Sequence, residues 1–150
     1  MTTGQIVLLA AVALAMGFGA WRALRDGRFL GTHVVKGAES TTDEDPGVLA
    51  GTDVEQTLGE RATLLQFSSA FCAPCRATRR VLGEVAELVP GVTHVEIDAE
   101  HHLALVRRVG VLRTPTTLIL DADGREVGRA TGMPKRDEVL ATLARVVVPE

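Results

Sequence analysis

The sequence predicts an α/β domain, a central mixed β-sheet flanked by helices, preceded by one N-terminal transmembrane helix. Three observations predict it. The chain opens on a long uncharged apolar stretch, strand and helix patterns alternate after residue 52, and both cysteines lie between a predicted strand and a predicted helix. The length of 150 residues fits one domain with an attachment.

The N-terminal stretch is long enough to span a bilayer. Residues 2–21 carry no charged side chain, and these 20 residues as a helix cross the ~30 Å hydrocarbon core. Trp21 lies at the end of the stretch, where an interfacial aromatic residue is expected. We therefore expect residues 4–21 to enter the membrane within an anchor and juxtamembrane segment of residues 1–31. A cleaved signal peptide and a buried helix are the alternatives, although no Lys or Arg precedes the stretch and no polar face interrupts it.

Positive charges follow the apolar stretch and predict its orientation. Arg22, Arg25 and Arg28 come after it, and only the α-amino group precedes it. The positive-inside rule then places the C-terminal domain on the cytoplasmic side, with an extracytoplasmic domain as the alternative. Residues 32–51 are interpreted as a linker, because 36–47 are rich in Gly, Ser, Thr and acidic residues and have no apolar periodicity.

The folded domain is expected over residues 52–148. Thr52 and Glu55 match a capping box and predict a short first helix. The apolar run 63–67 predicts a buried strand, and apolar residues at helical spacing over 81–89 predict a helix that ends at Pro90-Gly91. Alternation over 92–97 predicts a second strand.

The second half of the domain continues this alternation of helices and strands. Residues 100–109 predict a helix with acidic residues, Asp98 and Glu100, at its start and with Arg107 and Arg108 at its end. Residues 116–120 and 126–130 flank a turn at 121–124 and predict a β-hairpin. Apolar residues at helical spacing over 139–147 predict a last amphipathic helix.

Composition excludes several classes of protein. The net charge of −3 argues against a nucleic-acid partner. Two cysteines are too few for a small secreted scaffold held together by several disulfides. Aromatic residues make up only 3% of the chain, so the core is expected to be aliphatic.

Both cysteines belong to one Cys-x-x-Cys motif, residues 72–75, in a strand–turn–helix setting that suits redox chemistry. At a helix N-terminus, free backbone N–H groups and the helix dipole would stabilise the thiolate of Cys72, and Arg76 adds positive potential. Cys75, one turn along, is placed to attack a mixed disulfide formed at Cys72. Pro74 suits the first turn, where no N–H is needed.

Two other roles for the cysteines have less support. Two structural thiols in a core would not need this strand–turn–helix setting. A structural zinc ion needs four ligands, but the chain has no second cysteine pair, and the adjacent His101 and His102 would point apart on a helix. We therefore expect no metal.

Several motifs together resemble the thioredoxin family over residues 52–148. They are the Cys72–Cys75 turn, Ile97-Asp98 at the end of a strand, Arg113-Thr114-Pro115-Thr116 before a strand, Asp123-Gly124 in the hairpin and Gly132 before the last helix. The resemblance implies a thioredoxin fold, with Pro115 in cis beside the cysteines and the Thr114 backbone pairing with an incoming substrate chain. Phe71, Ala73, Pro74 and Arg76, which adjoin the cysteines, are candidate substrate-binding or supporting residues.

The chain departs from the family pattern around the cysteines. Phe71 replaces the usual Trp, which keeps hydrophobic cover without the indole N–H, and Ala73-Pro74 replaces Gly-Pro. Gln66 stands where thioredoxins have a buried acid, and an amide cannot accept the proton of Cys75. His94 stands where the family has a Lys. Gln66 and His94 are candidates for proton transfer or redox tuning, and the alternative is that both are ordinary buried polar residues.

The function expected from these features is that of a membrane-tethered thiol–disulfide oxidoreductase, a disulfide reductase with protein disulfides as substrates. Thioredoxin reductase or another thiol donor would recharge it, because no flavin or nucleotide fingerprint occurs in the chain. No cofactor besides the redox-active disulfide is expected. The alternatives are a non-catalytic thioredoxin-fold binding module and an extracytoplasmic thioredoxin-like protein that acts on exported thiols.

Overall fold

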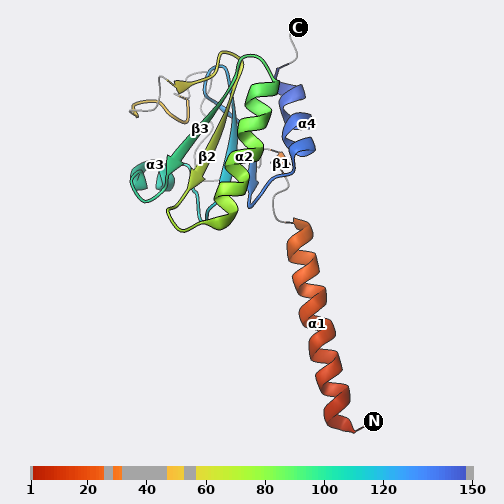
Figure 1. Cartoon of the computed structure of the whole chain (residues 1–150). Helices are drawn as coiled ribbons and strands as arrows, with labels where there is room; N and C mark the ends of the chain where they lie inside the picture. Colours follow the sequence, from red (N-terminus) through yellow and green to blue (C-terminus); the bar gives the residue numbers. More distant parts are fainter. Residues whose placement is uncertain (1, 26–28, 32–46, 53–56, 148–150) are drawn as a thin grey trace.

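The computed structural model describes residues 2–25, 29–31, 47–52 and 57–147 (Figure 1). Its elements are α1 (Thr3–Arg25), β1 (Phe29–Gly31), β2 (Ala62–Ser68), α2 (Ala73–Leu88), β3 (Val92–Asp98), α3 (Leu103–Arg108), β4 (Thr116–Asp121), β5 (Glu126–Thr131) and α4 (Arg136–Val146). The strands form one sheet in the order β1-β5-β4-β2-β3. β2 and β3 are parallel, and the other neighbouring pairs are antiparallel. A mixed sheet flanked by helices confirms the predicted fold class.

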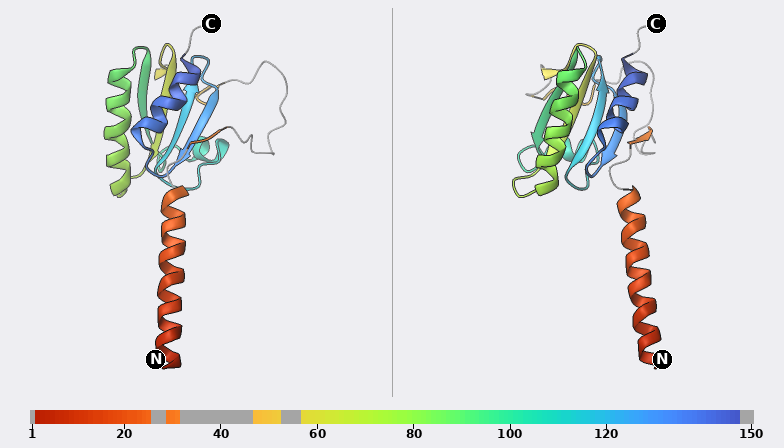
Figure 2. Two further views of the ribbon diagram at one scale, coloured as in Figure 1. Left: turned by 90° about the vertical axis from the view of Figure 1, so that its right-hand side faces the viewer. Right: turned by 45° about the vertical axis from the view of Figure 1, so that its right-hand side comes forward.

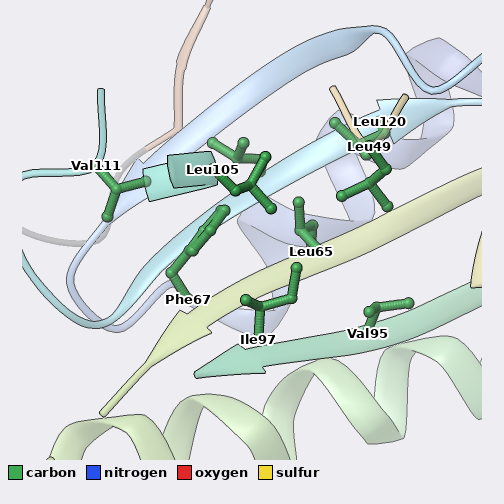
Figure 3. Close-up of a cluster of buried hydrophobic side chains, with 9 residues drawn as sticks. Leu49, Leu65, Phe67, Val95, Ile97, Leu105, Val111 and Leu120 are labelled. Carbon is green, nitrogen blue, oxygen red and sulfur yellow. The ribbon is translucent and has the colours of Figure 1, made fainter. Parts of the chain in front are cut away.

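Hydrophobic clusters cover both faces of the sheet. On one face, α2 and α4 pack side by side over the strands (Figure 2), and the cluster comprises Ala62, Leu64, Leu82, Val85, Val92, Ile119, Val139 and Leu143. On the other face, α3 contributes Leu105 to a second cluster, in which the strand side chains Phe67, Val95 and Ile97 point away from α2 (Figure 3). β2 supplies Leu64 to the first cluster and Leu65 and Phe67 to the second. All seven residues of β2 are buried, which explains why the strand shows no regular alternation of apolar and polar residues.

Part of the predicted linker packs into the domain. Leu49 is fully buried in the second cluster, although the sequence places it within the linker, residues 32–51. The guanidinium of Arg108 donates hydrogen bonds to the carbonyls of Val48 (2.6 Å) and Ala50 (3.1 Å), which hold this stretch against α3. The backbone N–H of Val48 also donates to the carbonyl of Gly124. These contacts bring residues 47–50 into the core of the domain.

Two predicted helices differ from the structure or fall outside it. The helix expected over 100–109 begins only at Leu103, because the carboxylate of Asp98 accepts the backbone N–H of Glu100 (2.9 Å) and favours a turn there. Arg107 and Arg108 do lie in its last turn, as predicted. Of the short helix expected at 52–55, only Thr52 is among the described residues. The hydroxyl of Thr52 donates to the carbonyl of Leu49 (2.6 Å).

The N-terminal helix α1 stands apart from the sheet and its helices (Figure 1). Within the part of the chain that the structure describes, it is the one helix long and apolar enough to cross a membrane, over Thr3–Arg22. A signal sequence near an N-terminus meets the same criterion. The large apolar side chains of α1, from Ile6 to Trp21, are exposed. The strand β1 follows α1 and was not predicted from the sequence; it pairs with β5 at the edge of the sheet.

Candidate active site

The two cysteines form a disulfide at the start of α2. The Cα atoms of Cys72 and Cys75 lie 5.2 Å apart, and Cys72 is the N-cap residue of the helix. The backbone N–H of Cys75 donates to the Cys72 sulfur over 3.2 Å. Pro74 lies in the first turn, where its missing N–H leaves no intrahelical hydrogen bond unmade. The local sequence thus places the Cys72 sulfur at the positive end of the helix dipole.

The two cysteines differ in their access to solvent. Cys72 is partly exposed, whereas Cys75 is only 2% exposed. Cys72 is therefore the cysteine that is open to solvent, whereas Cys75 is shielded from it. This difference gives structural support to the roles that the sequence predicts for the two residues.

Gln66 lies beneath Cys75 and is fully buried. Its Nε2 donates to the carbonyl of Cys75 over 3.0 Å, and its Oε1 lies 3.2 Å from His94 Nε2. Because Oε1 can only accept, the hydrogen-bond pattern assigns the ring proton of His94 to Nε2. The structure thus brings both candidate tuning residues into one chain of hydrogen bonds that ends on the backbone of Cys75. It does not bring His94 to the sulfur.

Burial and neighbouring charges act in opposite directions on His94. Burial lowers the pKa of His94, and this effect outweighs the Glu96 carboxylate, which favours the charged imidazole. The nearby Arg79 guanidinium lowers the pKa further. His94 is therefore a neutral hydrogen-bond donor at physiological pH rather than a charge.

One carboxylate near the cysteines was missed in the sequence analysis. Glu96 lines the same open cleft as Cys72 and Cys75 and accepts two bonds from Arg79, from Nε to Oε2 (2.5 Å) and from Nη2 to Oε1 (2.8 Å). Burial would raise the pKa of Glu96, but hydrogen bonds from Arg79 and Ser68 outweigh it and keep the pKa below its ordinary range. The alternation of β3 places residue 96 on the same face as His94, and this periodicity could have found it.

The Thr114–Pro115 peptide bond is cis, as the resemblance implies. The hydroxyls of Thr114 and Ser69 lie 3.1 Å apart, and the Ser69 carbonyl accepts the backbone N–H of Cys72. Thr114 is therefore hydrogen-bonded to Ser69, and Ser69 in turn is hydrogen-bonded to Cys72 in the turn that carries the disulfide. Pro115 itself is buried, and its carbonyl accepts the N–H of Gly132 over 2.8 Å.

The remaining candidates lie on the surface around the disulfide. Ala73 and Pro74 are exposed in the first turn of α2, and Arg76 is exposed along the cleft. Phe71 is 99% exposed, so the expectation that its ring covers the cysteines is wrong. The ring extends into solvent from the turn before α2. Among the described residues, no group of three His, Cys, Asp or Glu side chains is arranged to hold a metal ion.

Comparison with known proteins identifies the family. A family model described as a thioredoxin-like domain matches residues 53–146. The chain belongs to this family. Thioredoxin from Alicyclobacillus acidocaldarius is 32% identical over 90 residues, which cover 59% of this chain and 85% of that protein. Thioredoxin from Chlamydia trachomatis is 26% identical over 98 residues, which cover 65% and 95%.

A solved structure shows the same fold. A mutant thioredoxin from Halobacterium salinarum superposes with a TM-score of 0.56 at 23% identity, and the match covers 61% of this chain and 79% of that one. Similarity at this level of identity concerns the fold alone. Together with the Cys72–Cys75 disulfide, membership of the thioredoxin-like family makes thiol–disulfide exchange the chemistry of this site.

Proposed function

We propose that this protein is a membrane-tethered disulfide reductase that acts through Cys72 and Cys75. The observation that carries the proposal is a disulfide at the N-terminus of α2 in which one cysteine is partly exposed and the other is buried. Thiol–disulfide exchange needs an accessible, stabilised thiolate for attack and a second thiol close behind it. The helix N-terminus supplies the first at Cys72, and the turn supplies the second at Cys75.

The reaction balances without any other redox group. The Cys72 thiolate attacks a protein disulfide, forms a mixed disulfide and releases one substrate thiolate, which takes a proton from water. Cys75 then loses its proton and attacks the Cys72 sulfur, which forms the Cys72–Cys75 disulfide and releases the second substrate thiol. The substrate gains two electrons and the enzyme loses two. Thioredoxin reductase or another thiol donor would return the enzyme to the dithiol form, with no further cofactor.

The proton of Cys75 is proposed to leave through water in the open cleft. Gln66 is an amide and has no basic atom. Both oxygens of Glu96 are bound by Arg79, and Ser68 donates to the same carboxylate, which makes it a weak base. His94 presents an N–H rather than a lone pair to Gln66. A water-mediated step fits this set of neighbours, because none of the three offers a free acceptor to the buried thiol.

The substrate chain is proposed to lie across Thr114 and Pro115. Two observations support this placement: family membership and the Ser69–Thr114 hydrogen bond, which connects this loop to the Cys72 turn. The Thr114 backbone would pair with the main chain of the substrate, while the substrate disulfide lies against Cys72. Protein disulfides are the proposed substrate class.

Reduction of a protein disulfide by the full-length protein in detergent tests the proposal. With dithiothreitol as donor, the wild type is expected to reduce insulin well above the rate of the donor alone, and Cys72→Ser to lose this activity. Cys75→Ser is expected to accumulate a mixed disulfide with the substrate, because the attack remains and the resolving thiol is gone. A wild type that does not exceed the donor under any reducing condition would instead support a non-catalytic binding module.

The membrane part of the proposal concerns α1. We propose that α1 forms the anchor, with residues 4–21 in the membrane, and that the domain, to which β1 and residues 47–50 also belong, lies on the cytoplasmic side. The exposed apolar surface of α1 supports insertion in a membrane, and the arginines after it support this orientation. After reduction, the two cysteines are the only thiols in the chain. A membrane-impermeant maleimide should therefore label inverted membrane vesicles and spare right-side-out ones, and the opposite pattern would place the domain outside.

A further inference from the structure

The charged side chains that line the cleft beside the disulfide do not all have partners. The cleft contains Arg76, Arg79, Glu96 and Asp98. Arg79 and Glu96 neutralise each other through their two-point ion pair. Asp98 accepts bonds from the backbone of Glu100 and from His101 Nδ1 over 2.9 Å each.

Arg76 is the basic side chain of the cleft that forms no ion pair with a described residue. Asp98 keeps its negative charge, because a hydrogen bond from a backbone N–H does not neutralise it. Among the residues that the structure describes, no carboxylate lies within 4.0 Å of its guanidinium. Its side chain is exposed, and its backbone directly follows Cys75. The first turn of α2 contains no acidic residue, so the partial positive charge of the helix N-terminus adds to that of Arg76. The unpaired positive charge of the cleft therefore lies on α2, directly after Cys75, whereas the Asp98 carboxylate lies at the end of β3.

We propose that Arg76 determines the substrate specificity of this site and favours disulfides with acidic side chains next to the reacting cysteine. The proposal rests on the proposed reductase function and deepens it. As the Cys72 thiolate attacks, a carboxylate beside the substrate disulfide comes close to the guanidinium of Arg76 and lowers the energy of the transition state relative to a neutral or basic neighbour. Bonds, protons and electrons are exchanged as in the reductase reaction itself, so the specificity needs no new chemical step.

Arg80 provides a matched control on the same helix. It carries the same charge and is exposed, one residue after Arg79, but it does not line the cleft. A change at Arg80 alters the net charge of the protein by the same amount as a change at Arg76. A difference between the two variants therefore reports the position of the charge rather than the overall field.

The test compares two disulfide peptides that are identical except for Asp or Lys on either side of one cysteine. For the full-length protein in detergent, with dithiothreitol as donor, the wild type is expected to show a kcat/KM about 1.4- to fivefold higher for the Asp peptide, the range that one exposed ion pair supports. The preference should decline in 1 M salt because exposed charges are screened. Arg76→Gln is expected to bring the ratio near one, and Arg76→Glu to reverse it. Arg80→Glu should keep the preference for Asp.

The ratio of the two rates isolates specificity from general reactivity. A substitution at Arg76 that merely changes the reactivity of Cys72 alters both rates together and leaves their ratio unchanged. If Arg76→Gln and Arg76→Glu keep the ratio of the wild type, or if Arg80→Glu changes it equally, Arg76 is not the specificity residue. If the wild type reduces neither peptide above the donor alone, the proposed reductase function itself fails, which is a different outcome.

Discussion

The side-chain amide of Gln66 donates a hydrogen bond to the carbonyl of Cys75 over 3.0 Å, from the strand beneath the disulfide. The second polar atom of the amide faces His94. The buried position under the resolving cysteine is thus occupied by an uncharged group whose donor and acceptor are both satisfied. The arrangement avoids the cost of burying a carboxylate and holds the first turn of α2 to the sheet.

Replacing Gln66 with Leu is expected to lower the free energy of unfolding by about 1–3 kcal/mol, the cost of leaving buried polar groups without partners. The Nε2–H of His94 would lose its acceptor, and the carbonyl of Cys75 would lose one of its donors. Urea denaturation of the full-length protein in detergent, followed by circular dichroism at 222 nm, measures this change. The single Trp lies in α1, so intrinsic fluorescence would not follow the domain. A change below about 0.5 kcal/mol would mean that the two hydrogen bonds contribute little.

Replacing Thr117 with Val is expected to have the opposite effect. Thr117 is fully buried opposite Gln66 on β4, and its hydroxyl has no hydrogen-bond partner among the described residues. A methyl group of similar shape removes an unsatisfied polar atom, so stability should be unchanged or rise by up to about 1 kcal/mol. The same denaturation measurement applies. A clear loss of stability would indicate that the hydroxyl binds an internal water molecule.

The stability of the domain should depend on pH through His94. Its pKa is lower in the folded state than the ordinary value of 6.5, so the unfolded chain binds the proton more tightly. The stabilisation is complete above about pH 6.5 and is lost as the pH falls toward the folded pKa, with a slope of at most about 1.4 kcal/mol per pH unit. His94→Gln keeps an N–H donor for Gln66 without a titrating ring. Its stability should fall less between pH 6.5 and 5 than that of the wild type, and equal slopes would contradict the prediction.

Removing the charge of Glu96 should make the reduced cysteine more reactive. In Glu96→Gln, the Arg79 guanidinium is no longer neutralised and adds positive potential to the cleft, which favours the Cys72 thiolate. The pH midpoint for alkylation by iodoacetamide is therefore expected to shift downward, while stability changes by less than about 1 kcal/mol. Glu84→Gln, further along α2 and outside the cleft, is the control and should leave the midpoint unchanged. An upward shift in Glu96→Gln would show that the carboxylate assists deprotonation.

Truncation of Leu49 tests whether residues before position 52 belong to the folded core. Leu49→Ala is expected to destabilise the domain by about 2–5 kcal/mol, because the side chain is fully buried. Leu112→Ala, at a leucine that is 96% exposed, should change stability by no more than about 0.5 kcal/mol. If the two variants behave alike in denaturation, the packing of Leu49 contributes nothing to the fold.

Much of the fold could be predicted from the sequence because its signals are local. The predicted strand 63–67 is Ala62–Ser68 in the structure, and 92–97 is Val92–Asp98. Their apolar patterns follow from the burial of their side chains against the helices on the two faces of the sheet. β1 could not be predicted in this way. Its three residues carry no periodicity, and the strand exists because β5 presents a free edge to it.

The site was predictable in its residues but not in its contacts. The Cys-x-x-Cys motif, Gln66 and His94 each have a signal in the sequence, whereas the hydrogen bond that joins Gln66 to His94 depends on the parallel register of β2 and β3. The Arg79–Glu96 ion pair joins residues 17 positions apart on different elements. Only the packing of α2 over β3 brings them together, and no local pattern encodes it.

The attachment of β1 to the sheet limits how far the disulfide can lie from α1. Three residues separate Arg25, the last of α1, from Phe29, the first of β1. At no more than about 3.6 Å per residue, Arg25 and Phe29 lie within roughly 14 Å of each other. The link between α1 and the domain is therefore this short segment and not the longer stretch 32–51, which begins only after the chain has joined the sheet. With α1 in a bilayer, the enzyme would search a shallow layer at the membrane surface, and clients deeper in solution would have to diffuse into that layer.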